Sequence, residues 1–134
     1  MAIDVKWING KQTVCKLEFP AVWTWSEVSE AQKQLEAMID QVSHDCAALF
    51  VLPSNTKLPM NILSNGLRIL NNSHPRIKLF VLVTSNAVVR TIAEMTHKLS
   101  HDLREHFYIT DTIEQAREAL IAAGYLSVED RIGV

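Results

Sequence analysis

Residues 46–53 read Cys46-Ala47-Ala48-Leu49-Phe50-Val51-Leu52-Pro53, an apolar run that ends at a proline. The run has no polar alternation, which is typical of a central strand that is buried on both faces of a sheet. A second apolar run of this kind reads Ile77-Lys78-Leu79-Phe80-Val81-Leu82-Val83. Because doubly buried strands belong to sheets that are covered by helices, the two runs predict an α/β fold.

The N-terminal segment predicts a β-hairpin with strands at residues 4–8 and 13–19. The link Asn9-Gly10 is a strong two-residue hairpin turn, since both residues accept positive φ. In the second strand the apolar residues mark one face, and Lys16 and Glu18 point the other way. The two strands are therefore expected to pair antiparallel.

Helices are predicted between and after the remaining strands. The first begins with the capping box Thr24-Trp25-Ser26-Glu27 and the last with Thr112-Ile113-Glu114-Gln115. Their apolar residues recur every three or four positions, as in a helix with one buried face. The first two expected helices cover residues 26–43 and 59 or 60 to 71. The third is capped by Ser85 or Asn86 and ends near residue 107, and the last covers residues 113–124. The core stripe of the third helix is expected to be Val88 or Val89, Ile92, Met95, Leu99 and Leu103.

With a short strand at residues 107–109, the element order is ββαβαβαβα. Right-handed crossovers then give a mixed sheet, an N-terminal antiparallel hairpin followed by βαβαβα, with about four helices packed on it. We expect a single domain over residues 1–126. Residues 127–134 are expected to be a loosely attached C-terminal tail.

The composition is that of a soluble globular protein. The 134 residues are 48% hydrophobic and 21% charged, and the net charge of -2 disfavours a nucleic-acid partner. The N-terminus lacks the apolar core of a signal peptide, and no apolar run approaches the ~20 residues of a membrane span. We therefore expect a cytoplasmic protein in which Cys15 and Cys46 are small buried residues, with redox chemistry as the alternative.

Ligand and partner sites of open α/β sheets tend to lie outside the carboxyl ends of the parallel strands. The residues expected there, which we call the rim, are polar and nearly uncharged. They are Ser54, Asn55, Thr56, Lys57, Asn61, Ser64, Asn65, Ser85 and Asn86. Lys57 is the only charged member, and the rim has no general base, paired carboxylates or glycine-rich phosphate loop. We therefore expect no catalytic residue, no cofactor and no enzymatic activity.

His97 and His101 are four residues apart and so share a helix face, the spacing of two metal ligands. We expect both to face solvent and to hold no metal, because a zinc site needs three or four protein ligands. Trp23 and Val28 occupy the two positions of a hydrophobic staple. Trp25 either packs on a neighbouring apolar surface or is exposed as an aromatic anchor for a partner.

The stretch Leu63-Ser64-Asn65-Gly66-Leu67 near the start of the second helix is similar to the Asp-Ser-Ser-Gly-Leu motif of anti-sigma factor antagonists. Together with the element order, it makes the chain resemble a STAS domain. Residues 23–25, 86–91 and 111–116 are similar to those of small stand-alone bacterial STAS-like proteins. The resemblance implies a regulatory protein partner. In this chain Asn65 replaces the serine that is normally phosphorylated, so Ser64 is the substitute candidate for phosphorylation. Gly66 is expected to let the helix approach its neighbours.

The first hypothesis for function is a non-enzymatic regulatory or protein-interaction module that uses the rim as its contact surface. The second is a carrier for an apolar small molecule or lipid, held in a pocket between sheet and helices. Met38, Met60 and Met95 are candidates for an adaptable lining of such a pocket, with ordinary core packing as the favoured alternative. An enzyme ranks third and requires two titratable groups that converge in one cleft. The first hairpin strand is expected at a sheet edge and could pair with a second copy in a homodimer.

Overall fold

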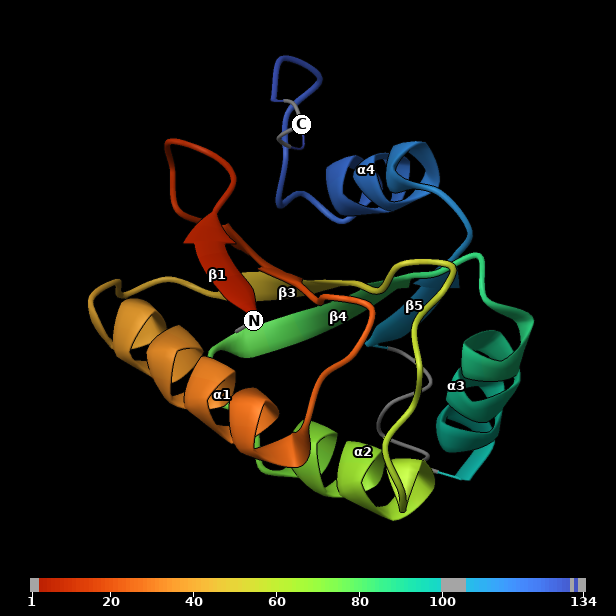
Figure 1. Cartoon of the computed structure of the whole chain (residues 1–134). Helices are drawn as coiled ribbons and strands as arrows, with labels where there is room; N and C mark the ends of the chain where they lie inside the picture. Colours follow the sequence, from red (N-terminus) through yellow and green to blue (C-terminus); the bar gives the residue numbers. More distant parts are fainter. Residues whose placement is uncertain (1–2, 100–105, 131, 133–134) are drawn as a thin grey trace.

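The computed structural model describes residues 3–99, 106–130 and 132 (Figure 1). Its sheet has the strand order β1-β2-β3-β4-β5. The strands are β1 (Asp4–Trp7), β2 (Val14–Glu18), β3 (Cys46–Val51), β4 (Ile77–Val83) and β5 (Phe107–Thr110). β1 and β2 pair antiparallel, and the other neighbours pair parallel. The predicted α/β fold with a mixed sheet is confirmed. β1 lies at a sheet edge, and its pairing with a second copy stays a prediction.

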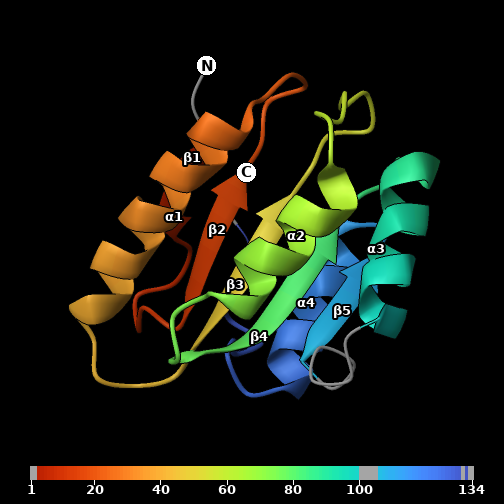
Figure 2. The same ribbon diagram turned by 90° about the horizontal axis from the view of Figure 1, so that it is seen from below.

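Helices cover both faces of the sheet. They are α1 (Trp25–Asp40), α2 (Ile62–Asn71), α3 (Ala87–Leu99) and α4 (Ile113–Ala122). α1, α2 and α3 lie side by side on one face, and α4 lies on the other (Figures 1 and 2). Two clusters of buried apolar side chains fill the two faces, one beneath the three helices and one beneath α4. This arrangement explains why β3 and β4 are apolar on both sides.

Local hydrogen bonds and backbone conformation set the ends of several helices. Thr24 and Glu27 form the predicted capping box at α1, and the Thr112 hydroxyl accepts a hydrogen bond from the Gln115 amide at α4. α1 ends at Asp40, earlier than predicted, because the next two amides bond to carbonyls three residues back. α2 begins at Ile62 because Asn61 takes a left-handed conformation with φ 60°. The predicted end of the third helix lies outside the described residues.

The predicted two-residue turn at Asn9-Gly10 is wrong. The connection spans residues 8–13, and its left-handed residue is Gln12, with φ 57°. The Asn9 side chain accepts hydrogen bonds from the Thr13 and Val14 amides at 3.1 and 3.3 Å. This side chain therefore closes a longer loop by capping backbone groups, a role that asparagine often has in turns.

The α4 face of the sheet buries the side chain of Lys16 and part of the C-terminal segment. Lys16 shares this covered face with Val14, so its side chain is only 5% exposed. Its Nζ lies 3.2 Å from Glu18 Oε1. Part of the C-terminal segment lies against this face in the described residues 126–130 and 132. Leu126 and Ile132 are buried, and the Arg117 guanidinium donates a hydrogen bond of 2.9 Å to the Asp130 carbonyl.

Cys15 and Cys46 are free thiols inside the core beneath α1 to α3. Burial, reinforced by the nearby Cys46, raises the pKa of the Cys15 thiol from 9.0 to about 12. The unfolded chain therefore loses this proton at a lower pH than the folded chain does. Stability from the protonated thiol is complete below pH 9 and is lost as the pH rises through the range up to 12.

We therefore expect the wild type to lose about 1 kcal/mol more unfolding free energy between pH 7.5 and pH 10 than Cys15→Ala does. Urea denaturation at both pH values measures this difference. The pKa values of Cys46 and Tyr125 are also raised by burial, but both groups are present in both proteins. Parallel losses in the two proteins would contradict the assignment.

Candidate functional site

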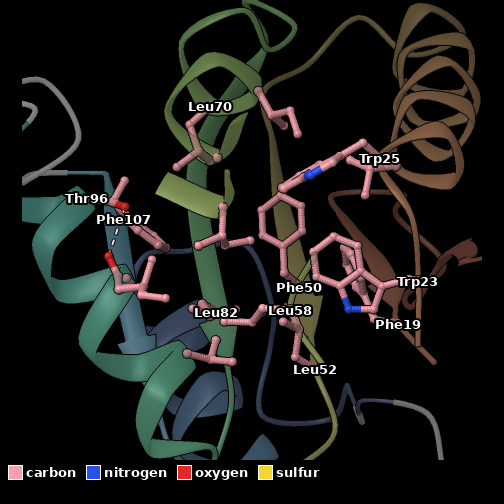
Figure 3. Close-up of a pocket in the computed structure, with 17 residues that line it drawn as sticks. Phe19, Trp23, Trp25, Phe50, Leu52, Leu58, Leu70, Leu82, Thr96 and Phe107 are labelled. Atoms are coloured by element: carbon pink, nitrogen blue, oxygen red, sulfur yellow. Dashed lines mark hydrogen bonds between the residues drawn. The ribbon is translucent and has the colours of Figure 1, made fainter. Parts of the chain in front are cut away.

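A cavity of about 140 Å³ lies between the sheet and the helices α1, α2 and α3 (Figure 3). Side chains from both layers line it, and nearly all of them are apolar. The lining residues are Phe19, Trp23, Trp25, Val28, Phe50, Leu52, Leu58, Ile62, Gly66, Ile69, Leu70, Leu82, Val89, Ile92, Ala93, Thr96 and Phe107. A second pocket, of about 30 Å³, shares Phe19, Val28, Phe50 and Ile69 with it.

One wall of the cavity is aromatic. The rings of Phe19 and Trp23 meet edge to face with centroids 5.1 Å apart, and those of Trp23 and Trp25 do the same at 5.3 Å. Phe50 stacks on Phe80 at 6.0 Å and lies 6.5 Å from Phe19. Edge-to-face and stacked contacts are favourable geometries for aromatic pairs. The rings therefore support one another and form a firm wall.

Both tryptophan N–H groups in this wall are already bonded within the protein. Trp23 Nε1 donates to Thr56 Oγ1 at 3.0 Å, and Trp25 Nε1 donates to the Met60 carbonyl at 2.7 Å. The rings thus offer apolar surface and no free donor to a ligand. Of the two alternatives left open for Trp25, the structure places it partly buried against the core, as a cavity wall.

The second wall is α2, which contributes Ile62, Gly66, Ile69 and Leu70 from one helix face. No residue of α2 is buried, whereas α1 buries four of its residues. Asn61 makes no side-chain cap bond at the start of α2. α2 therefore covers the cavity as a lightly packed element.

The third wall is α3, which contributes Val89, Ile92, Ala93 and Thr96. The Thr96 hydroxyl donates to the Ile92 carbonyl at 3.0 Å (dashed line in Figure 3), so this polar group is also satisfied. Of the stripe predicted for this helix, Val89 and Ile92 face the sheet side, but Val88 and Met95 do not. These two are 62% and 47% exposed, respectively.

The phase of α3 is set at its start. Asn86 Oδ1 accepts from the amides of both Val88 and Val89, at 3.0 and 3.1 Å, and Val89 is the one that is turned inward. Met38, Met60 and Met95 are absent from the cavity lining, and Met38 packs against the core, which was the alternative for it. Met60 is 82% exposed.

The rim residues fall into two groups at the carboxyl ends of the strands. Asn86 Nδ2 donates to the Ser54 carbonyl at 2.9 Å, which joins the loop after β3 to the start of α3. Asn65 Nδ2 and the Ser64 hydroxyl both donate to the Asn61 carbonyl, at 3.0 and 3.4 Å. Exposed members of the rim are Ser54, Asn55, Lys57, Asn61, Ser64 and Ser85.

Among the rim residues, Thr56 alone lies in the protein interior. It is buried, because its hydroxyl accepts from Trp23 Nε1 and donates to the Ala21 carbonyl at 3.3 Å. Thr56 is thus a support of the aromatic wall rather than a contact residue. Apart from Trp25, no cavity residue was among the predicted site residues, since an apolar side chain gives the same sequence signal whether it meets protein or empty space.

Charged groups are absent from the described lining of the cavity. The groups with a raised pKa, namely Cys15, Cys46 and Tyr125, lie elsewhere. In the described ranges no three His, Cys, Asp or Glu side chains gather in a way that could hold a metal ion. His101 lies outside those ranges. His97 is partly buried rather than solvent-facing, with its ring 6.2 Å from that of Phe107.

No family model, curated protein or solved structure matches the chain. The resemblance to STAS domains therefore stays a prediction. Within residues 3–99, 106–130 and 132, no helix combines the length and the apolar composition needed to cross a membrane.

The role of Thr56 can be tested by Thr56→Val. This change keeps the shape of the side chain but leaves the buried Trp23 N–H without its acceptor, so we expect a loss of about 1–3 kcal/mol in unfolding free energy. Thr56→Ser keeps the hydroxyl and is the matched control. Urea denaturation followed by tryptophan fluorescence measures both variants, and equal losses would contradict the role of the hydrogen bond.

Proposed function

We propose that the protein binds a compact, uncharged, apolar small molecule in the cavity beneath α1, α2 and α3. The observation that carries this proposal is a 140 Å³ space with an apolar lining in which the tryptophan and threonine side-chain donors are already bonded internally. Ligand sites are usually concave and mostly apolar, with few polar groups. The lining of this cavity is almost entirely apolar, and its tryptophan and threonine donors are bonded within the protein.

The volume limits the size of the ligand. A dry apolar cavity of roughly 150 Å³ in another protein accepts benzene. With about 140 Å³, the cavity here matches a single ring or a short branched alkyl group. A longer molecule would have to extend out of the cavity or displace part of its wall.

The chemistry of the lining limits the charge of the ligand. A charged or strongly polar group that leaves water needs a partner, and the described lining offers neither an opposite charge nor a free hydrogen-bonding side chain. The ligand is therefore uncharged in the part that enters. This is the second of the three hypotheses from the sequence, without the methionine lining.

Toluene and benzoate form a matched pair that tests the proposal. We expect calorimetric titration to give a dissociation constant on the order of 0.1–1 mM for toluene and no measurable binding for benzoate. Native mass spectrometry of freshly purified protein would then identify a co-purifying ligand. Absence of toluene binding, or equal binding of the two compounds, would contradict the proposal.

A carboxylate placed in the wall locates the binding site. Ile92→Glu puts a charge at the cavity, and we expect toluene affinity to fall by at least about tenfold. Thr91→Glu places the same charge on the exposed side of α3 and should bind toluene as the wild type does. Circular dichroism checks that both variants fold. Equal affinities of two folded variants would show that toluene binds elsewhere.

A protein-interaction module at the rim is the second candidate. It is favoured by three large exposed apolar side chains, Val22, Met60 and Val88, each of which is paired with or close in sequence to a rim residue. Exposed apolar residues that gather beside polar ones are a feature of interaction sites.

A photo-crosslinking residue at position 60 tests the second candidate in cells. A discrete protein adduct is expected there, and none is expected with the same residue at position 30 on the exposed face of α1. Identical adduct patterns at the two positions would argue against a specific rim partner.

A further inference from the structure

Gly66 has no evident structural reason to be glycine. It lies inside α2, and it is not among the residues with positive φ. A Cβ built on Gly66 meets no atom within 4 Å, so the expected close approach of α2 to its neighbours is wrong. Glycine is also among the least favourable residues in a helix interior. The backbone and the packing would both accept a larger residue.

The position of Gly66 on α2 shows what its missing side chain leaves open. Gly66 is four residues after Ile62 and three before Ile69, and all three residues line the cavity. Side chains at these spacings share one helix face. A side chain at position 66 would therefore extend between those of Ile62 and Ile69 into the cavity.

We infer that Gly66 is the size-determining residue of the binding site, keeping room beneath α2 for the ring of an uncharged apolar ligand. The inference rests on the proposed function. The aromatic wall is fixed by its own contacts and hydrogen bonds, so the size of the cavity depends on the side chains of α2. Gly66, near the centre of α2, has no side chain that would fill this space.

Gly66→Leu is the first test, with toluene as the probe. The leucine side chain fills the space that toluene would occupy, and we expect affinity to fall by more than about tenfold relative to the wild type. Arg68→Leu places the same side chain at an exposed position of α2 outside the rim and the cavity lining, and should leave the affinity unchanged. The urea midpoint of Gly66→Leu is expected to stay level or rise, because the change fills a cavity and improves helix propensity.

Gly66→Ala is the second test and does not depend on the folding of the leucine variant. One methyl group added to the cavity should disfavour larger ligands, so the ratio of butylbenzene to benzene affinity is expected to fall by about tenfold. A structural requirement for glycine would instead lower the urea midpoint of Gly66→Ala and leave this ratio unchanged.

The outcomes separate the two levels of the argument. Wild-type protein that binds none of these hydrocarbons removes the proposed function and this inference with it. Wild-type protein that binds toluene, with Gly66→Leu binding it equally well or with an unchanged ratio in Gly66→Ala, removes only the role of Gly66. A loss of affinity in Gly66→Leu and a shifted ratio in Gly66→Ala, with Arg68→Leu unchanged, support it.

Discussion

Unequal packing of three helices on one face of the sheet is the constraint from which the cavity arises. α1 buries Val28, Ala31, Leu35 and Ile39, but α2 buries none of its residues. Protein interiors are otherwise close-packed, and atoms that border a void lose the dispersion contacts they would make across it. The space beneath α2 is therefore a local deficit in stability. A ligand that fills it recovers those contacts, which is the physical basis for the proposed binding.

The two sides of the cavity differ in how firmly they are held. Trp23 is buried, meets two neighbouring rings edge to face, and bonds to Thr56 across the loop after β3. α2 follows a left-handed Asn61 and has no side-chain cap. A preformed wall lowers the cost of binding, because little has to be ordered on that side. Adjustment to ligands of different shape is then expected in α2.

The sheet could be predicted from the sequence because its signals are local. The apolar runs that became β3 and β4, and the capping boxes at Thr24 and Thr112, depend on neighbouring residues only. The site could not be predicted in this way. Thr56 lies 33 residues from its partner Trp23, so its burial had no local signal. Phe50 and Leu82 look like ordinary core residues, because hydrophobicity does not reveal whether a side chain meets protein or a void.

The rim and the cavity meet in the loop that leads into α2, so the two candidate functions need not be independent. Leu58 and Ile62 line the cavity. Lys57, just before Leu58, and Asn61, just before Ile62, are exposed. The Met60 carbonyl, in the same loop, holds the Trp25 indole. A ligand can shift an equilibrium only as far as it binds one arrangement better than another. A molecule seated between Trp25 and α2 contacts this loop directly, so any preference it has among loop arrangements also changes the surface offered by the rim. Ligand binding and partner binding would then be coupled through this one loop, without a change in the sheet.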